Sequence, residues 1–264
     1  MGIDHCSFIP PKSGVFITLH KCASQFFSRQ LLPNLRNRTL IDYQWLHYED
    51  RLHDRVEIHK RGHIYGPVRI LDKEHPSYGI TEDLLSKCLD DGLKAIIFIR
   101  DPRDILVSMY FSFGFGHPLS PQADIREFQL RRRSGIQALD VNAYVVQAAP
   151  ALLEKFDRIS VFCQQAKEKI VLRYEDMCCD FACFYARLNS FVGIRAGIQN
   201  KLYRLTRPEK TENLSRHKRL GEPGGFRQKL HHEVIAELNG LFTRVLTDFQ
   251  YEATDGCPPA GFQP

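Results

Sequence analysis

A lysine followed by small residues comes directly after the first apolar segment of the chain. Val15–Leu19 runs into His20-Lys21-Cys22-Ala23-Ser24-Gln25-Phe26. Small side chains let backbone N–H groups approach an anion, a helix N-terminus adds unpaired donors, and Lys21 adds a full positive charge. The segment lacks the glycines of the nucleotide-triphosphatase loop. It indicates a phosphate site at a strand–helix junction, with a solvated Lys21 before an ordinary helix as the alternative.

A second junction follows the most apolar run of the sequence, Ala95–Ile99, where Arg100 precedes Asp101-Pro102-Arg103-Asp104. A guanidinium at a strand end can present a planar fork to a phosphate. Asp101 is suited to cap the next helix, and proline to its first position. One narrow polar stripe along that helix consists of Asp104, Ser108 and Ser112. The pattern is compatible with an anion site. Taken alone it favours the alternative, in which Arg100 pairs with Asp101 or Asp104 and the serines bond helix carbonyls.

The two junctions can form one site only if the fold brings the ends of their strands together. Short β-branched runs alternate with longer amphipathic ones, which predicts an α/β fold with a mostly parallel central sheet flanked by helices. We expect strands at Val15–Leu19, Thr39–Tyr43, His63–Tyr65, Ala95–Ile99 and Ile170–Leu172. We expect helices from about Ser24, from an N-cap at Thr81 to Asp90, and over 121–133, 140–167, 180–192 and 230–249. In such folds ligands bind at the carboxyl ends of the strands.

Length, composition and charge narrow the class of protein. The 264 residues predict a single domain over 1–264, with its core at about 15–249 and loose termini. Ala95–Ile99 is far shorter than the ~20 residues of a membrane span, and the N-terminus lacks a secretion signal. The eight cysteines lack metal-ligand spacing and are expected to be reduced thiols in the cytoplasm. We expect no metal site and no membrane association, and the net charge of +5 fits an anionic ligand.

Two further segments complete a set of four motifs: Leu172-Arg173-Tyr174-Glu175-Asp176-Met177 and Arg219-Leu220-Gly221-Glu222-Pro223-Gly224-Gly225-Phe226-Arg227. The set resembles the sulfotransferases that use 3′-phosphoadenosine-5′-phosphosulfate (PAPS). The segment around Lys21 is similar to their 5′-phosphosulfate loop, and the segment from Arg100 to Tyr110 to their 3′-phosphate motif. The other two look like their Tyr-Glu-Asp strand end and their Arg-Lys-Gly-x-x-Gly segment. The resemblance implies a P-loop-like sulfotransferase fold and transfer of a sulfuryl group to a hydroxyl or amine.

The resemblance also assigns roles to positions in this sequence. Lys21 matches the lysine that contacts the sulfuryl group and its bridging oxygen, and Phe26 falls where many members place a tryptophan against adenine. The cradle of the 5′-phosphate would come from Cys22, Ala23, Ser24 and Gln25. The 3′-phosphate would be held by Arg100 and Ser108, with Arg219 and the Gly221 backbone closing over it. Glu175 would support the site rather than react.

The sequence departs from the family pattern at three places. Ala23 stands where glycine is usual, and Leu220 replaces a second basic residue. The catalytic histidine that follows the family's third strand has no counterpart in the segment Tyr65–Arg69. An alcohol acceptor still needs a base near neutral pH. The candidates are His117 in the glycine-rich loop 113–118, His20 beside the loop lysine, and His63, each of which is alternatively a structural histidine.

Other functions stay open at the level of the sequence. A kinase on a related fold would need the glycine loop that is missing here, and an inactive cofactor-binding homologue would explain the missing histidine. The basic cluster of Arg126, Arg131, Arg132 and Arg133 belongs to no recognised nucleic-acid module, so we expect no nucleic-acid partner. We expect a small-molecule acceptor, such as a bacterial natural product, and leave open a homodimer.

Overall fold

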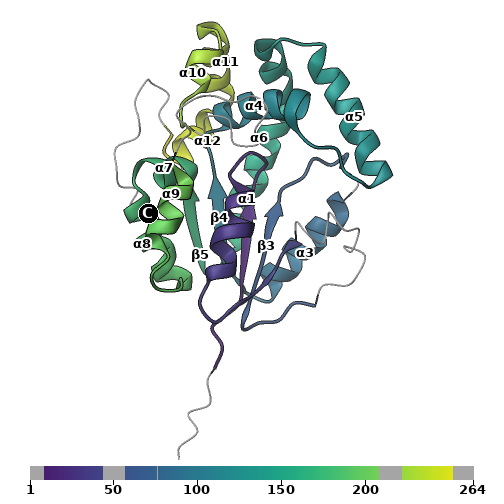
Figure 1. Cartoon of the computed structure of the whole chain (residues 1–264). Helices are drawn as coiled ribbons and strands as arrows, with labels where there is room; N and C mark the ends of the chain where they lie inside the picture. The colour runs from purple at the N-terminus through teal and green to yellow at the C-terminus, as the bar shows by residue number, and fades with distance from the viewer. Residues whose placement is uncertain (1–8, 44–56, 76, 208–221, 252–264) are drawn as a thin grey trace, which may run out of the picture.

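Figure 1 shows the computed structural model of the chain, which describes residues 9–43, 57–75, 77–207 and 222–251. Within these residues, five strands form an all-parallel sheet in the order β2-β3-β1-β4-β5. The strands are β1 (Gly14–Thr18), β2 (Thr39–Ile41), β3 (His63–Arg69), β4 (Lys94–Ile99) and β5 (Lys169–Arg173). The order reverses at β1, with β3 on one side and β4 on the other. A crevice forms at the carboxyl ends of strands at such a point, and ligands bind there.

Helices cover both faces of the sheet. In the view of Figure 1, α1 (Ser24–Phe26) crosses in front of the sheet, α3 (Tyr78–Asp90) lies at the right, and α8 (Phe181–Val192) and α9 (Gln199–Thr206) lie at the left. The helices between β4 and β5 are α4 (Pro102–Phe111), α5 (Ala123–Gln137) and α6 (Val141–Gln165). The remaining helices are α7 (Tyr174–Cys179), α10 (Phe226–Lys229), α11 (His232–Leu241) and α12 (Thr243–Asp248). Three short helical turns complete the set: η1 (Phe27–Leu31), η2 (Leu32–Asn34) and η3 (Ser112–Gly116).

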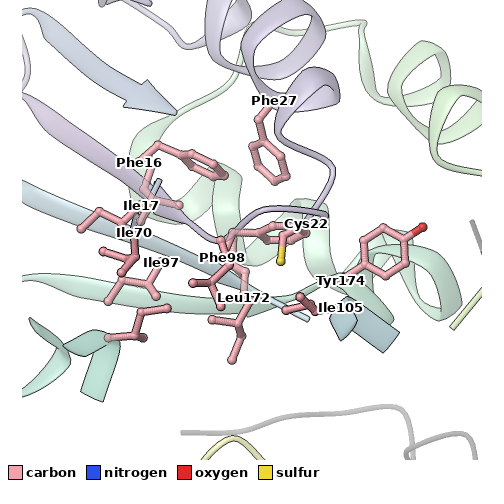
Figure 2. Close-up of a cluster of buried hydrophobic side chains, with 14 of the residues drawn as sticks. Phe16, Ile17, Cys22, Phe27, Ile70, Ile97, Phe98, Ile105, Leu172 and Tyr174 are labelled. Atoms are coloured by element: carbon pink, nitrogen blue, oxygen red, sulfur yellow. The ribbon is translucent and has the colours of Figure 1, made fainter. Parts of the chain in front are cut away.

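The hydrophobic core forms because the strands are apolar on both faces, as expected for a parallel sheet that is covered by helices. Every residue of β1 is buried. On one face the rings of Phe16 and Phe98 lie 4.2 and 4.5 Å from the ring of Phe27, which descends from η1 (Figure 2). Ile17 and Ile97 belong to the same buried cluster. This packing fixes the first strand–helix junction against the sheet.

The expected elements are present, with differences at their ends. The helix expected to begin at Thr81 begins at Tyr78, with Ser77 at the N-cap position. The Thr81 hydroxyl donates instead to the Ser77 carbonyl four residues earlier, so Thr81 lies inside the helix and does not cap it. The helix expected over 230–249 is divided into α11 and α12 at Phe242, whose ring is buried.

Strand β3 is longer than the sequence predicts because it continues through Gly66-Pro67. The register with β1 shifts between Val15 and Ile17, which absorbs the irregular backbone. Gly66 has a φ of +135°, and a Cβ there would lie 2.6 Å from the Phe16 carbonyl oxygen. Only glycine fits this position. The extension carries Arg69 to the carboxyl edge of the sheet, in register with Thr18.

Candidate active site

The loop between β1 and α1 is tightly wound. Lys21 and Ala23 have φ values of 66° and 50°, in the left-handed region that favours glycine. Each such residue costs about 1–2 kcal/mol. Ser24 begins α1 and is buried. The loop therefore holds a strained shape at the N-terminus of a helix, at the point where β1 ends.

The side chain of Lys21 points to the end of α4. Its Nζ atom donates to Ser112 Oγ at 2.7 Å and lies 5.9 Å from the centre of the Phe113 ring. Ser112 is the last residue of the polar stripe predicted from the sequence. The contact therefore joins the first junction to the second across the pocket mouth.

Arg100 lies beneath the loop and is almost fully buried. Its Nη1 donates to the Lys21 carbonyl at 3.2 Å, and its guanidinium stacks 4.4 Å above the ring of Tyr174. An ion pair of 3.5 Å joins it to Asp104. This pairing is one of the two that the alternative without an anion would use, and it forms because Asp101 is bonded instead to Arg103 at 2.7 Å. It leaves Arg100 Nε buried without a partner among the described residues, so the guanidinium keeps a donor at the cavity that it lines.

Asp104 links the helix α4 to a distant part of the chain. Its carboxylate accepts the N–H groups of Gly224 at 2.7 Å and Phe226 at 3.0 Å. Burial raises the pKa of Asp104, while Arg100 opposes that rise. The segment from Glu222 to Lys229 is thereby placed over the same pocket. Arg219 and Gly221, expected to close over the 3′-phosphate, lie outside the described residues.

A cavity of about 370 Å³ opens at this edge of the sheet. Most of the predicted cofactor contacts line it, namely Lys21, Ala23, Ser24, Gln25, Phe26, Arg100 and Ser108. Cys22 does not line it, because its side chain is fully buried, and burial raises the pKa of its thiol to about 12. Only the backbone of Cys22 is therefore available to a ligand.

Glu175 lies behind the cavity rather than in its wall. Its Oε1 accepts the Asp101 N–H at 3.0 Å, and its Oε2 is buried with no partner among the described residues. Burial, reinforced by the nearby Asp101 carboxylate, raises the pKa of Glu175 to about 8. This position fits a supporting role beneath the α4 junction.

The structure adds a residue to the site that the sequence reasoning missed. Arg69 lines the cavity, and its Nη2 donates to Ser24 Oγ at 2.7 Å. Its Nε is buried without a partner in the described part of the chain, and burial lowers the pKa of the guanidinium to about 10. The available signal was a basic residue at the end of the strand that neighbours β1.

The three candidate histidines divide between the two ends of the sheet. His20 and His117 both line the cavity, and the Phe113 ring lies 5.6 Å from the imidazole of His20 and 5.4 Å from that of His117. His63 begins β3 at the opposite edge, where its Nδ1 lies 2.9 Å from the Arg61 carbonyl. The direction of the strand removes His63 from the site.

The basic cluster on α5 does not form one exposed face. Arg131 is exposed and pairs with Glu127 one turn away. Arg132 turns inward, where its guanidinium lies 4.3 Å from the centre of the Phe113 ring. Arg133 donates to the carbonyls of Phe113 and His117 and so holds the loop at the pocket mouth.

No group of three or more histidine, cysteine, aspartate or glutamate side chains in the described part of the chain is arranged to hold a metal ion. No helix in it is long and apolar enough to cross a membrane.

A parallel α/β sheet with cationic side chains around a cavity at its carboxyl edge is an arrangement in which proteins of this fold class can bind phosphorylated ligands. A family model, the sulfotransferase domain, matches residues 17–250, so the chain belongs to the sulfotransferase family. The assignment made from the four motifs, to an enzyme family of this fold, is confirmed.

A solved sulfotransferase structure agrees with this fold. A structure of mouse sulfotransferase SULT7A1 complexed with PAP aligns with a TM-score of 0.56 at 16% identity, covering 90% of this chain and 85% of that one. A structure of retinol dehydratase in complex with retinol and PAP aligns with a TM-score of 0.47 at 15% identity, covering 91% and 83%. A search of curated protein sequences finds no match.

Proposed function

We propose that this sulfotransferase moves a sulfuryl group from PAPS to a hydroxyl or amine of a small-molecule acceptor. The observation that carries the proposal is the link between the two phosphate junctions. Arg100 donates to the carbonyl of Lys21, so that both cations belong to one cavity at the carboxyl edge of the sheet. Membership of the sulfotransferase family supports the reaction class.

The residues present fit an anionic cofactor. The Nε atoms of Arg69 and Arg100 are both buried without partners among the described residues, and both side chains line the cavity. A buried unsatisfied donor costs about 1–3 kcal/mol. Anionic oxygens in the cavity would satisfy both donors and remove that cost. The PAP bound in the mouse sulfotransferase structure is an example of such an anionic ligand.

Each end of the cofactor has its own protein groups in this proposal. Lys21 and Arg69 would hold the sulfuryl end, with the backbone of Ala23 and Gln25 and the Ser24 hydroxyl at the 5′-phosphate. The 3′-phosphate would be held by Arg100 and Ser108. Phe26, half-buried in the cavity wall, offers a ring face to adenine. Arg219 and Gly221 remain predictions for the closing segment.

The chemistry required of the protein is mainly positioning and charge stabilisation. When bound, PAPS supplies an activated sulfuryl group on a phosphate leaving group. In this proposal Lys21 Nζ would stabilise the negative charge that develops on the bridging oxygen. The apolar walls, including Val107 and Met177, exclude water from the transfer.

His20 is the general base that we favour. Burial, together with the positive charges of Arg69 and Lys155, holds the pKa of His20 well below its ordinary value. The imidazole is therefore neutral at pH 7 and able to accept a proton. A bound anionic cofactor would oppose the effect of these cations and strengthen the base. His117 is the second candidate because it lines the same cavity.

The central experiment compares Lys21→Ala with Lys87→Ala in an assay of labelled sulfate transfer from PAPS. Lys87 is an exposed lysine on α3 that pairs with Asp83, and it serves as the matched control. Lys21→Ala should abolish transfer with an unchanged melting temperature, and the control should retain full activity. Undiminished sulfate transfer by Lys21→Ala would refute the proposed role of Lys21.

Thermal unfolding with 3′,5′-bisphosphoadenosine beside ATP tests the cofactor. At a hundredfold excess over its dissociation constant, a ligand stabilises the folded state by about 2.7 kcal/mol. Stabilisation by the bisphosphate but not by ATP supports the proposal. Stabilisation by ATP alone would favour a kinase, and binding without any transfer would favour an inactive homologue.

A trio of histidine variants tests the base. His20→Gln should lower kcat by about 10²–10⁴-fold, the usual contribution of a general base. His63→Gln is the control because it lies at the far edge of the sheet. A larger loss of kcat in His117→Gln than in His20→Gln would identify His117 as the general base.

Four further features are part of the proposal. We propose a single catalytic domain, supported by one buried cluster that includes residues from Val15 to Tyr251. The six described cysteines are free thiols, which supports a reducing compartment such as the cytoplasm. A natural product as acceptor and a homodimer are proposed from the sequence, and sedimentation of the purified protein tests the dimer.

A further inference from the structure

A second, smaller cavity adjoins the proposed acceptor end of the main one. It has a volume of about 50 Å³, and the two cavities share the walls formed by His20, Phe113 and His117. One water molecule needs about 10–15 Å³ by this measure, so the space fits a group of about four heavy atoms. That is the size of a carboxylate or a sulfonate.

The lining of this small cavity carries positive charge and several hydrogen-bonding imidazoles. Arg132 and Arg133 contribute guanidinium groups, and His75 adds a third imidazole to the two shared ones. None of the described residues that line it is an aspartate or a glutamate. The remaining walls include the ring of Phe128. Such a lining attracts a compact anion attached to an apolar or aromatic body.

Arg132 is the cation of this cavity that is best placed for a ligand. The carboxylate nearest to it, Asp72, already has a closer partner, since Lys155 Nζ lies 2.6 Å from one oxygen and Arg132 Nη1 lies 3.6 Å from the other. Arg133 is committed to the backbone of the pocket loop. The charge of Arg132 is therefore only loosely compensated, and stacking on the Phe113 ring holds its guanidinium in place.

The geometry also relates Arg132 to the reaction centre. Lys21 Nζ lies 5.9 Å from the centre of the Phe113 ring and the Arg132 guanidinium lies 4.3 Å from it, which bounds the separation of the two cations at about 10 Å. A molecule with one aromatic ring between its hydroxyl and its anionic group is short enough to contact both cations within this limit. The hydroxyl would lie at the sulfuryl end and the anion in the small cavity.

We propose that the acceptor carries an anionic group, and that Arg132 binds this group and sets the acceptor specificity. The inference rests on the proposed function of the main cavity and names the substrate class within it. Arg132 is a binding residue in this inference and takes no part in the transfer of the sulfuryl group.

The test measures binding of three phenols to the protein in the presence of 3′,5′-bisphosphoadenosine by calorimetry. Para-hydroxybenzoate and para-hydroxybenzenesulfonate carry the two kinds of anion, and para-cresol is the neutral counterpart. Charge-assisted hydrogen bonds predict about ten- to hundredfold tighter binding of an anionic phenol than of the cresol. Whether carboxylate or sulfonate binds better identifies the anion. Equal affinities, or no measurable affinity for either anion, would overturn the inference.

Variants of two neighbouring arginines assign the effect. Arg132→Gln should remove most of the discrimination, Arg132→Lys should restore part of it, and the exposed Arg131→Gln should leave it unchanged. In the transfer assay the loss should fall on KM for the anionic phenol rather than on kcat. Melting temperatures check that the Asp72 contact is not needed for folding. Full discrimination in a folded Arg132→Gln would also overturn the inference.

Failure of the proposed function has a different signature. In that case no phenol is sulfated, whatever its charge, and the bisphosphate either does not stabilise the protein or, in an inactive homologue, stabilises it without transfer. Failure of the acceptor inference alone leaves stabilisation and transfer both positive, with transfer to para-cresol at least as fast as to the anions.

Discussion

Replacement of Glu175 by glutamine should change how the stability of the protein depends on pH. The carboxyl group is buried, and burial with the negative charge of Asp101 raises its pKa to about 8, against an ordinary value of 4.5. In the unfolded chain the group loses its proton near the ordinary value. Between these two pKa values the folded state therefore holds a proton that the unfolded state has released.

The sign of the effect follows from this proton. Below pH 4.5 both states are protonated and Glu175 costs nothing through ionisation. As the pH rises towards 8, the unfolded state gains at the expense of the folded state, and stability falls by about 1.4 kcal/mol per pH unit. Between about pH 5 and pH 8 the loss amounts to about 3–4 kcal/mol. Glutamine does not ionise, and its carbonyl oxygen still accepts the Asp101 N–H.

The assay is urea unfolding of wild type and Glu175→Gln at pH values from about 5 to 9. The variant should gain on wild type by about 3–4 kcal/mol across the window and then run parallel above it. Glu154→Gln, at an exposed position that pairs with Lys73, should follow wild type throughout. A constant offset between Glu175→Gln and wild type would show that the buried carboxylate is already charged in the folded protein, and would refute the reasoning.

Three more predictions concern the frame and the base of the site. Gly66→Ala places a Cβ 2.6 Å from the Phe16 carbonyl at a φ of +135° and should cost about 3 kcal/mol or more, measured by urea unfolding against Gly79→Ala, which meets nothing within 4 Å. Arg103→Met should cost about 3–5 kcal/mol because it leaves the Asp101 carboxylate uncompensated, and Arg103→Met/Asp101→Asn should recover part of the loss. The kcat/KM of wild type should stay level as the pH falls through 6.5, because the pKa of His20 is held well below that value; a decline centred at 6.5 would contradict the assignment.

The two strand–helix junctions could be predicted from the sequence because each consists of consecutive residues. Asp101 accepts the N–H of Arg103 as the expected helix cap. Of the predicted polar stripe, Asp104 and Ser108 line the cavity and Ser112 accepts from Lys21. Capping and helical spacing are local properties, so no knowledge of the sheet was needed. The same holds for the loop at Lys21, which continues directly from its strand.

The parts that were missed depend on contacts between distant strands. Arg69 enters the site only because β3 pairs with β1 and continues past Tyr65, the end that the sequence suggested for it. His63 leaves the site for the same reason, since the strand direction carries it to the other edge. Arg132 was grouped with its basic neighbours, and only the packing of α5 against the loop at Phe113 separates it from them.

Side chains of the protein itself already hold the cations of the cavity in position. Lys21 is held by Ser112, and Arg69 by Ser24, each at 2.7 Å. Arg100 is held by Asp104 and by the ring of Tyr174. Groups that are already ordered lose little conformational entropy when a ligand arrives, so more of the electrostatic attraction remains as affinity.

Two of the side chains that hold these cations, Asp104 and Ser112, lie on one face of α4 and its continuation. The two ends of the site are therefore held by one helix. Asp104 in the first turn fixes Arg100 and the segment that covers the cavity, and Ser112, two turns later, fixes Lys21. A shift of α4 along its axis would therefore move both of the proposed anion sites at once. At the start of this helix the buried Arg103 bonds both Asp101 and Asn239. These bonds oppose such a shift, so we infer that they help to keep the two proposed sites at one separation.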